Sequence, residues 1–225
     1  MKGIKAFVFD AYGTLFDVLS VTALGEQLFP GRGTVLAQLW RTKQLQYSVL
    51  RSLMGRHKDF WHITEDALVY ACNALALELT SEARDRLLDA YLHLAAFPDV
   101  KPGLEALRAR GLRLGVLSNG EPTMLRAATE SAGISGLLDA IVSVEEVKIF
   151  KPSPRVYALA TERLGVTSAE LGFVSSNSWD VAGAASAGLR PLWIQRNTSE
   201  PADELGFGAE RVVRALTDVV ALLEA

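Results

Sequence analysis

Apolar and polar residues follow two different periods along this chain, and the change of period marks its elements. Residues 4–9 are a short run of apolar, β-branched and aromatic side chains, which is typical of a buried strand. Between residues 34 and 54 the apolar positions recur every three or four residues, the period of one helix face. Thr64, which precedes two acids, and Thr80, which precedes a serine and a glutamate, are typical helix starts. We therefore predict one strand followed by helices from residue 17 to about residue 95.

From residue 97 onwards the pattern alternates between strands and helices. Apolar runs predict strands over 112–117, 140–144, 172–174 and 191–195, with a further one near 211–213. Helical patterns separate them, over 103–110, 122–131, 154–164 and 181–187. Such alternation indicates right-handed βαβ units and a parallel sheet. We expect an α/β fold with a Rossmann-like parallel sheet core, residues 1–15 and 97–225, and an inserted helical subdomain, residues 16–96.

Polar side chains follow the predicted strands at their carboxyl ends. Asp10 follows the first strand, Ser118 and Asn119 follow the second, and Ser175 and Asn177 follow a later one. Open parallel sheets bind their ligands at this edge, so we expect these side chains to lie together. Asp10 is the candidate nucleophile, because a rigid strand would hold its carboxylate where a substrate can reach it. Taken alone, an aspartate after a strand more often only ends a turn.

Composition argues against several classes of function. The 225 residues carry a formal net charge of −3 without a block of lysine and arginine, so we expect no nucleic-acid partner. No apolar run approaches the ~20 residues that span a bilayer, which predicts no membrane partner. The single cysteine, Cys72, rules out an internal disulfide and a multi-cysteine metal site. The chain enters a strand at once without a signal peptide, so we expect a cytoplasmic protein.

Four clusters, in order along the chain, resemble the motifs of the haloacid dehalogenase superfamily. They are Asp10-x-Tyr12-Gly13-Thr14-Leu15, Leu117-Ser118-Asn119-Gly120, Phe150-Lys151-Pro152 and Ser175-x-Asn177-x-Trp179-Asp180. Any one of them is a weak signal, whereas all four at predicted strand ends are a specific one. Two further segments look like the L-2-haloacid dehalogenases in particular, namely Pro30-Gly31-Arg32-Gly33 and Trp40-Arg41-x-Lys43-Gln44-Leu45.

The resemblance implies a hydrolase acting on carbon–halogen bonds, an (S)-2-haloacid dehalogenase that needs no metal or other cofactor. It would convert short L-2-haloalkanoic acids to D-2-hydroxy acids with inversion, through an ester on Asp10. Thr14 would bond Asp10 and fix its rotamer. Arg41, from a helical cap over residues 16–96, would cradle the departing halide ion with help from Asn119. The resemblance also implies a homodimer through the cap helices.

Further residues are implied as substrate contacts. A 2-haloacid is itself a carboxylate, so the charge of Lys151 would neutralise it. Ser118 and backbone N–H groups near Tyr12 and Asn119 would donate hydrogen bonds to it. An apolar wall around the carbon chain is the other expected feature, although each member could be ordinary core: Tyr12, Leu45, Phe60 and Trp179.

Hydrolysis of the ester would depend on the last motif. Ser175, Asn177 and Asp180 resemble the set that positions the ester, Lys151 and water in this family, with Asp180 as candidate base or orienting group. Tyr157 is either core or a hydroxyl behind the site. No histidine matches a motif, which disfavours histidine catalysis and a histidine zinc site.

Two other functions stay open. A magnesium-dependent phosphatase could use Asp10, Asp180 and the backbone carbonyl of residue 12 as metal ligands. Phosphatases of the superfamily usually carry a second aspartate as acid for the leaving alkoxide, however, and this chain has Tyr12 there; a halide leaves without a proton. A non-enzymatic binding module that keeps the fold is the third possibility. The family usually has a glutamine at the position of Thr42, so the preferred halogen and chain length are also open.

Overall fold

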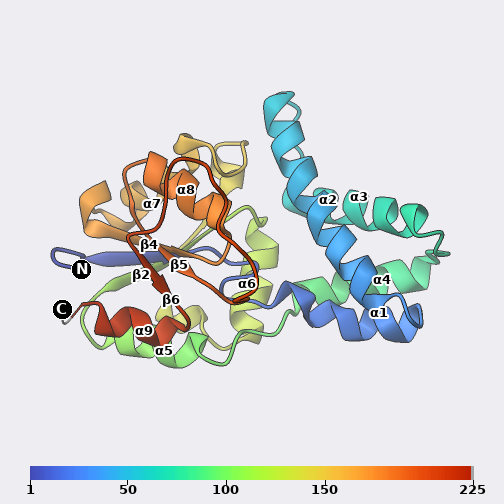
Figure 1. The fold of residues 1–225 in the computed structure, drawn as a ribbon, viewed down its shortest axis with the longest axis horizontal. Helices are drawn as coiled ribbons and strands as arrows, with labels where there is room; N and C mark the ends of the chain where they lie inside the picture. The colour runs from blue at the N-terminus through green and yellow to red at the C-terminus, as the bar shows by residue number, and fades with distance from the viewer. Residues whose placement is uncertain (224–225) are drawn as a thin grey trace.

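A six-stranded parallel sheet forms the core of the computed structural model, which describes residues 1–223 (Figure 1). Its strands are β1 (Ala6–Phe9), β2 (Arg113–Ser118), β3 (Ala140–Ser143), β4 (Leu171–Ser175), β5 (Arg190–Ile194) and β6 (Arg211–Val213). Their order is β3-β2-β1-β4-β5-β6, so β1 lies inside the sheet between β2 and β4. The chain therefore reverses its direction of winding at β1, and this kind of switch point is where open α/β sheets bind ligands.

Helices cover both faces of the sheet. They are α5 (Val100–Arg108), α6 (Pro122–Ser131), α7 (Pro154–Leu164), α8 (Ser178–Ser186) and α9 (Leu216–Ala221). Figure 1 shows α7 and α8 over one face and α5 and α9 over the other. All four residues of β1 are fully buried between these layers. The predicted Rossmann-like α/β core is confirmed.

Four helices between β1 and α5 lie together at one side of the sheet (Figure 1). They are α1 (Thr22–Leu28), α2 (Gly33–Leu53), α3 (Phe60–Ala74) and α4 (Ser81–Leu92). The two chain segments that connect them to the core run side by side. Phe16 forms an isolated bridge with Ala96, and the Phe97 N–H donates to the Leu15 carbonyl over 3.0 Å. Among residues 1–223, every helix is too short or too polar to cross a membrane.

Three predicted helix starts are wrong by about one turn, and one of them is the helix expected over 103–110, which begins at Val100. The helix expected from Thr64 begins at Phe60, because the Asp59 carboxylate accepts a hydrogen bond from the His62 N–H over 2.9 Å and caps it. Thr64 is fully buried inside that helix. The helix expected over 181–187 begins at Ser178, so the last motif runs into its first turn.

Candidate active site

Asp10 stands immediately beyond the carboxyl end of β1. Its N–H donates to the Val174 carbonyl over 2.9 Å, which continues the pairing with β4 by one residue. The chain then turns away at Gly13, where φ is +91°. Side chains other than glycine rarely adopt this backbone conformation, so the turn depends on that glycine. The carboxylate of Asp10 is thus held by a rigid element at the switch point of the sheet.

Four side chains hold the Asp10 carboxylate. Oδ2 accepts from Asn177 Nδ2 at 2.8 Å, from Thr14 Oγ1 at 3.0 Å and from Ser175 Oγ at 3.4 Å. Oδ1 accepts from the Lys151 ammonium at 3.0 Å. These donors come from the first, third and fourth motifs, which lie far apart in the sequence. The structure therefore brings the predicted residues together around one carboxylate whose orientation is fixed.

Lys151 links Asp10 to a second buried carboxylate. Its ammonium lies 2.8 Å from Asp180 Oδ2, and Tyr157 donates its hydroxyl to Asp180 Oδ1 over 2.6 Å. Burial lowers the pKa of Lys151, but Asp10 and Asp180 outweigh this effect and hold that pKa above its ordinary value. Burial raises the pKa of Asp180 to about 6, against the opposing effect of Lys151. Tyr157 is thus a buried residue whose hydroxyl contacts the site.

A small cavity lies next to Asp10. Its volume is about 10 Å³. Nine predicted site residues form its wall: Asp10, Tyr12, Arg41, Leu45, Phe60, Ser118, Asn119, Asn177 and Trp179. The wall combines the core with α2 and α3. Lys151 is absent from this wall, since its ammonium is directed at the two carboxylates behind it.

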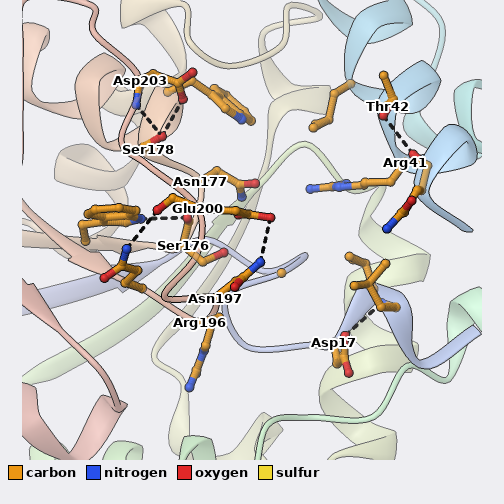
Figure 2. Close-up of a pocket in the computed structure, with 18 of the residues that line it drawn as sticks. Asp17, Arg41, Thr42, Ser176, Asn177, Ser178, Arg196, Asn197, Glu200 and Asp203 are labelled. Carbon is orange, nitrogen blue, oxygen red and sulfur yellow. Dashed lines mark hydrogen bonds between the residues drawn. The ribbon is translucent and has the colours of Figure 1, made fainter. Parts of the chain in front are cut away.

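Arg41 also lines a wider cleft beside this cavity. The cleft has a volume of about 600 Å³ and shares Arg41, Leu45, Asn177 and Trp179 with the cavity wall. Figure 2 shows Arg41 extending from α2 into the cleft on the side that faces Asn177. The Arg41 guanidinium donates to Gln44 Oε1 over 2.8 Å and to the Tyr12 carbonyl over 3.2 Å. A cation on the helical side therefore faces the carboxylate on the core side.

Thr42 belongs to the cleft and not to the cavity beside Asp10. Its hydroxyl donates to the Gln38 carbonyl one turn earlier over 2.8 Å (Figure 2). This departure from the family pattern therefore changes the approach to the site, while the nine residues around the cavity keep their expected types.

Comparison with known proteins agrees with this geometry. The family model of the haloacid dehalogenase-like hydrolases matches residues 4–188 of this chain. The (S)-2-haloacid dehalogenase of Pseudomonas sp. (strain YL) is 45% identical over 224 residues, which are 100% of this chain and 96% of that protein. This chain belongs to the haloacid dehalogenase-like hydrolases, among the L-2-haloacid dehalogenases.

Two solved L-2-haloacid dehalogenases share the fold over nearly their whole length. One is 46% identical, with a TM-score of 0.96 and coverage of 100% of both chains. The other, from Xanthobacter autotrophicus with chloropropionic acid covalently bound, is 41% identical, with a TM-score of 0.91 and coverage of 97% of this chain and 98% of that one.

The donor set of this dehalogenase-family site does not suit the Mg²⁺ that superfamily phosphatases use. Mg²⁺ requires oxygen ligands in near-octahedral array. Here the two carboxylates that could supply them, Asp10 and Asp180, already share the buried ammonium of Lys151. A dication between them would lie against that fixed positive charge. The third oxygen of that set, the backbone carbonyl of Tyr12, already accepts from the Arg41 guanidinium over 3.2 Å.

Sequence reasoning missed two residues that hold this site, Arg196 and Gln44. Arg196 donates to the Thr14 carbonyl over 2.8 Å and to Asp99 Oδ1 over 2.7 Å, so it ties β5 to both segments that lead to α1–α4. Gln44 bonds Arg41 from within the cap motif. Arg196 stands in no motif and gave no signal. Gln44 was part of a recognised segment, and a polar residue one turn from the key arginine was the available signal.

Proposed function

We propose that this dehalogenase-family member hydrolyses the carbon–halogen bond of short L-2-haloalkanoic acids and releases D-2-hydroxy acids, without a metal. The observation that supports this most directly is the Asp10 carboxylate, fixed by four donors, on the same small cavity as Arg41. Displacement at a saturated carbon needs this pairing of an anionic nucleophile with a cationic site for the leaving anion.

In the first step an oxygen of Asp10 attacks C2 of the substrate from the side opposite the halogen. A carbon–oxygen bond forms, and the carbon–halogen bond breaks with both electrons leaving on the halide. Arg41 stabilises the negative charge that develops there, and Asn119 on the same wall assists. The configuration at C2 is inverted, and the product is an ester of Asp10.

The substrate carboxylate is held by Ser118 and by backbone N–H groups near Asn119, beside the apolar wall of Leu45, Phe60 and Trp179. Lys151 acts from behind. Its contacts with both carboxylates support a role in balancing their charge, which lowers the repulsion that an incoming anion meets.

In the second step water attacks the carbonyl carbon of the Asp10 ester. Asp180 accepts a proton from this water and passes it to the ester oxygen as the bond between that oxygen and the carbonyl carbon breaks, so the hydroxy acid leaves as an alcohol and Asp180 returns to its ionised form. The second proton of the water goes to solvent, and Asp10 returns as a carboxylate. Because the bond between C2 and oxygen stays intact, only one inversion occurs. Burial raises the pKa of Asp180 to about 6, which makes its carboxylate a better proton acceptor and supports this assignment.

The deciding experiment is halide release by purified, EDTA-treated protein with L- and D-2-chloropropionate. We expect chloride from the L-isomer alone, with D-lactate as the product by chiral chromatography. Chloride release that requires added Mg²⁺, or phosphate release from aryl phosphates in its place, would overturn the proposal in favour of a phosphatase. Bromo-, iodo- and fluoro-acids in the same assay establish the halogen preference.

We also propose that residues 16–96 act as a cap on a core formed by residues 1–15 and 97–225. The two segments that pair at Phe16 and Ala96 support this division, because they connect residues 16–96 to the core. A homodimer through the cap is supported by exposed apolar side chains on α2 and α3, including Leu53 and Met54. A cytoplasmic location is consistent with the buried free Cys72.

A further inference from the structure

Gln44 is a fully buried polar side chain on α2 that makes three side-chain hydrogen bonds. Its Oε1 accepts from the Arg41 guanidinium at 2.8 Å and from the Tyr91 hydroxyl at 2.9 Å. Its Nε2 donates to Thr64 Oγ1 at 2.7 Å. The three partners come from α2, α4 and α3, so Gln44 joins three helices of the proposed cap behind the cavity wall.

The chemistry of the partners determines which way the Gln44 amide faces. A guanidinium has only donors, so the atom next to Arg41 must be the amide oxygen. The hydroxyl of Thr64 donates to the Phe60 carbonyl over 2.7 Å, so it can only accept from Gln44 Nε2. Tyr91 then donates to the same oxygen as Arg41 does. Each of these four hydrogen bonds therefore has one consistent donor.

The network also connects Arg41 to the residues that it must face. Phe60, whose carbonyl ends the chain of hydrogen bonds, lies on the wall of the cavity. The ring of Tyr91 packs on the ring of Tyr12, with 5.6 Å between centroids. Tyr12 in turn accepts from Arg41 through its backbone carbonyl. The guanidinium is thus fixed relative to two walls of the cavity.

We propose that Gln44 is a positioning residue that aims the Arg41 guanidinium at the departing halide and leaves its charge uncompensated. An amide oxygen orients the guanidinium as a carboxylate would, yet it carries no charge. The positive charge of Arg41 therefore remains available to the halide. This inference rests on the proposed function, since it concerns the leaving-group site of that reaction.

The test compares Gln44→Glu with Gln44→Met, using L-2-chloropropionate and L-2-bromopropionate. Gln44→Glu keeps the shape but pairs Arg41 with an anion, so we expect kcat to fall by about 10²-fold and inhibition by added bromide to weaken by at least tenfold, with KM little changed. Gln44→Met removes the acceptor without adding charge, and a smaller loss of kcat is expected. Gln44→Asn places the same amide on a shorter side chain, so its kcat should lie below that of the native protein.

Tyr91→Phe is the matched control. It removes one donor from Gln44 Oε1 and leaves the bonds to Arg41 and Thr64, so kcat should stay within about threefold of the native value. If the Gln44 variants fail to fold, Thr64→Val removes the anchor of Gln44 Nε2 and should lower kcat and weaken bromide inhibition together. A folded Gln44→Glu protein with native kcat and native bromide inhibition would overturn the inference. Absence of halide release from the native protein would instead refute the proposed function.

Discussion

At the scale of single residues, the site is a set of charges that hold one another in place. Two carboxylates, Asp10 and Asp180, share one ammonium at 3.0 Å and 2.8 Å. Oδ2 of Asp10 accepts from three side chains, whereas Oδ1 accepts from Lys151. A carboxylate oxygen can accept more than one hydrogen bond, so this arrangement fixes the rotamer without using all the acceptor capacity of the carboxylate.

Asp10→Asn tests the nucleophile. We expect halide release to fall by about a thousandfold or more, because a neutral amide is a poor nucleophile. The fold should persist, since Lys151 keeps its contact with Asp180. Halide release and thermal unfolding of the variant check both points. Near-native turnover in a folded Asp10→Asn protein would contradict the assignment.

The pH dependence of ester hydrolysis tests Asp180. Burial raises the pKa of Asp180 to about 6, and only the ionised form can accept the proton of the attacking water. Below about pH 6 the protonated form increases, so the rate of hydroxy-acid release should fall about tenfold per pH unit. Rapid-quench experiments should then show a burst of halide that runs ahead of hydroxy acid. In Asp180→Asn, release should be slow at every pH; an unchanged profile in this variant would contradict the role.

At the scale of elements, the site depends on how closely α8 packs against α7. Gly183 on α8 lies against Tyr157 on α7 and against Pro152, the residue after Lys151. A Cβ at position 183 would lie 2.4 Å from Tyr157 Oη and 2.6 Å from Pro152 Cβ. These distances are far below van der Waals contact, so a side chain here would push the two helices apart.

Gly183→Ala should therefore impair both stability and turnover. Overpacking of this kind costs about 1–3 kcal/mol, and it would displace the Tyr157 hydroxyl from Asp180. We expect a lower midpoint of thermal unfolding and a lower kcat. The matched control is Gly136→Ala, because nothing lies within 4 Å of a Cβ at Gly136. Equal effects of the two substitutions would show that close packing at Gly183 has no special importance.

Most of the elements and the motifs at strand ends could be predicted from the sequence. Strands such as Ala6–Phe9 are continuous apolar runs, and the polar residues after them meet because parallel strands end at one edge. The start of α3 was misplaced because the acids after Thr64 mimic a helix start, whereas the cap hydrogen bond comes from Asp59. The hydrogen bonds from Gln44 to Thr64 and Tyr91 could not be predicted from the sequence, because only tertiary packing brings α2, α3 and α4 together.

At the scale of the whole molecule, the site is formed by two parts of the chain that meet over the sheet edge. The helical side supplies Arg41, Leu45 and Phe60 to the wall of the cavity beside Asp10, and the core supplies the other six residues. Arg41 and Leu45 also line the wider cleft, so the helical side forms part of both spaces.

The homodimer proposal is tested on the outer face of the same helices. Leu53 and Met54, at the end of α2, are 80% and 62% exposed, and Val69 and Tyr70 on α3 are also exposed nearby around one groove that Met54 lines. Water contact at such a patch is unfavourable, and a second copy would remove it. Light scattering should give twice the chain mass of 24.4 kDa.

Leu53→Glu should shift the mass to that of one chain, because a dimer would bury the new charge without a partner. The control is Phe207→Glu, since Phe207 is 54% exposed in the segment before β6, which belongs to the core and not to the helices of the proposed interface. Turnover of the monomeric variant then separates assembly from chemistry. A monomeric native protein, or a dimer that survives Leu53→Glu and dissociates with Phe207→Glu, would refute this interface.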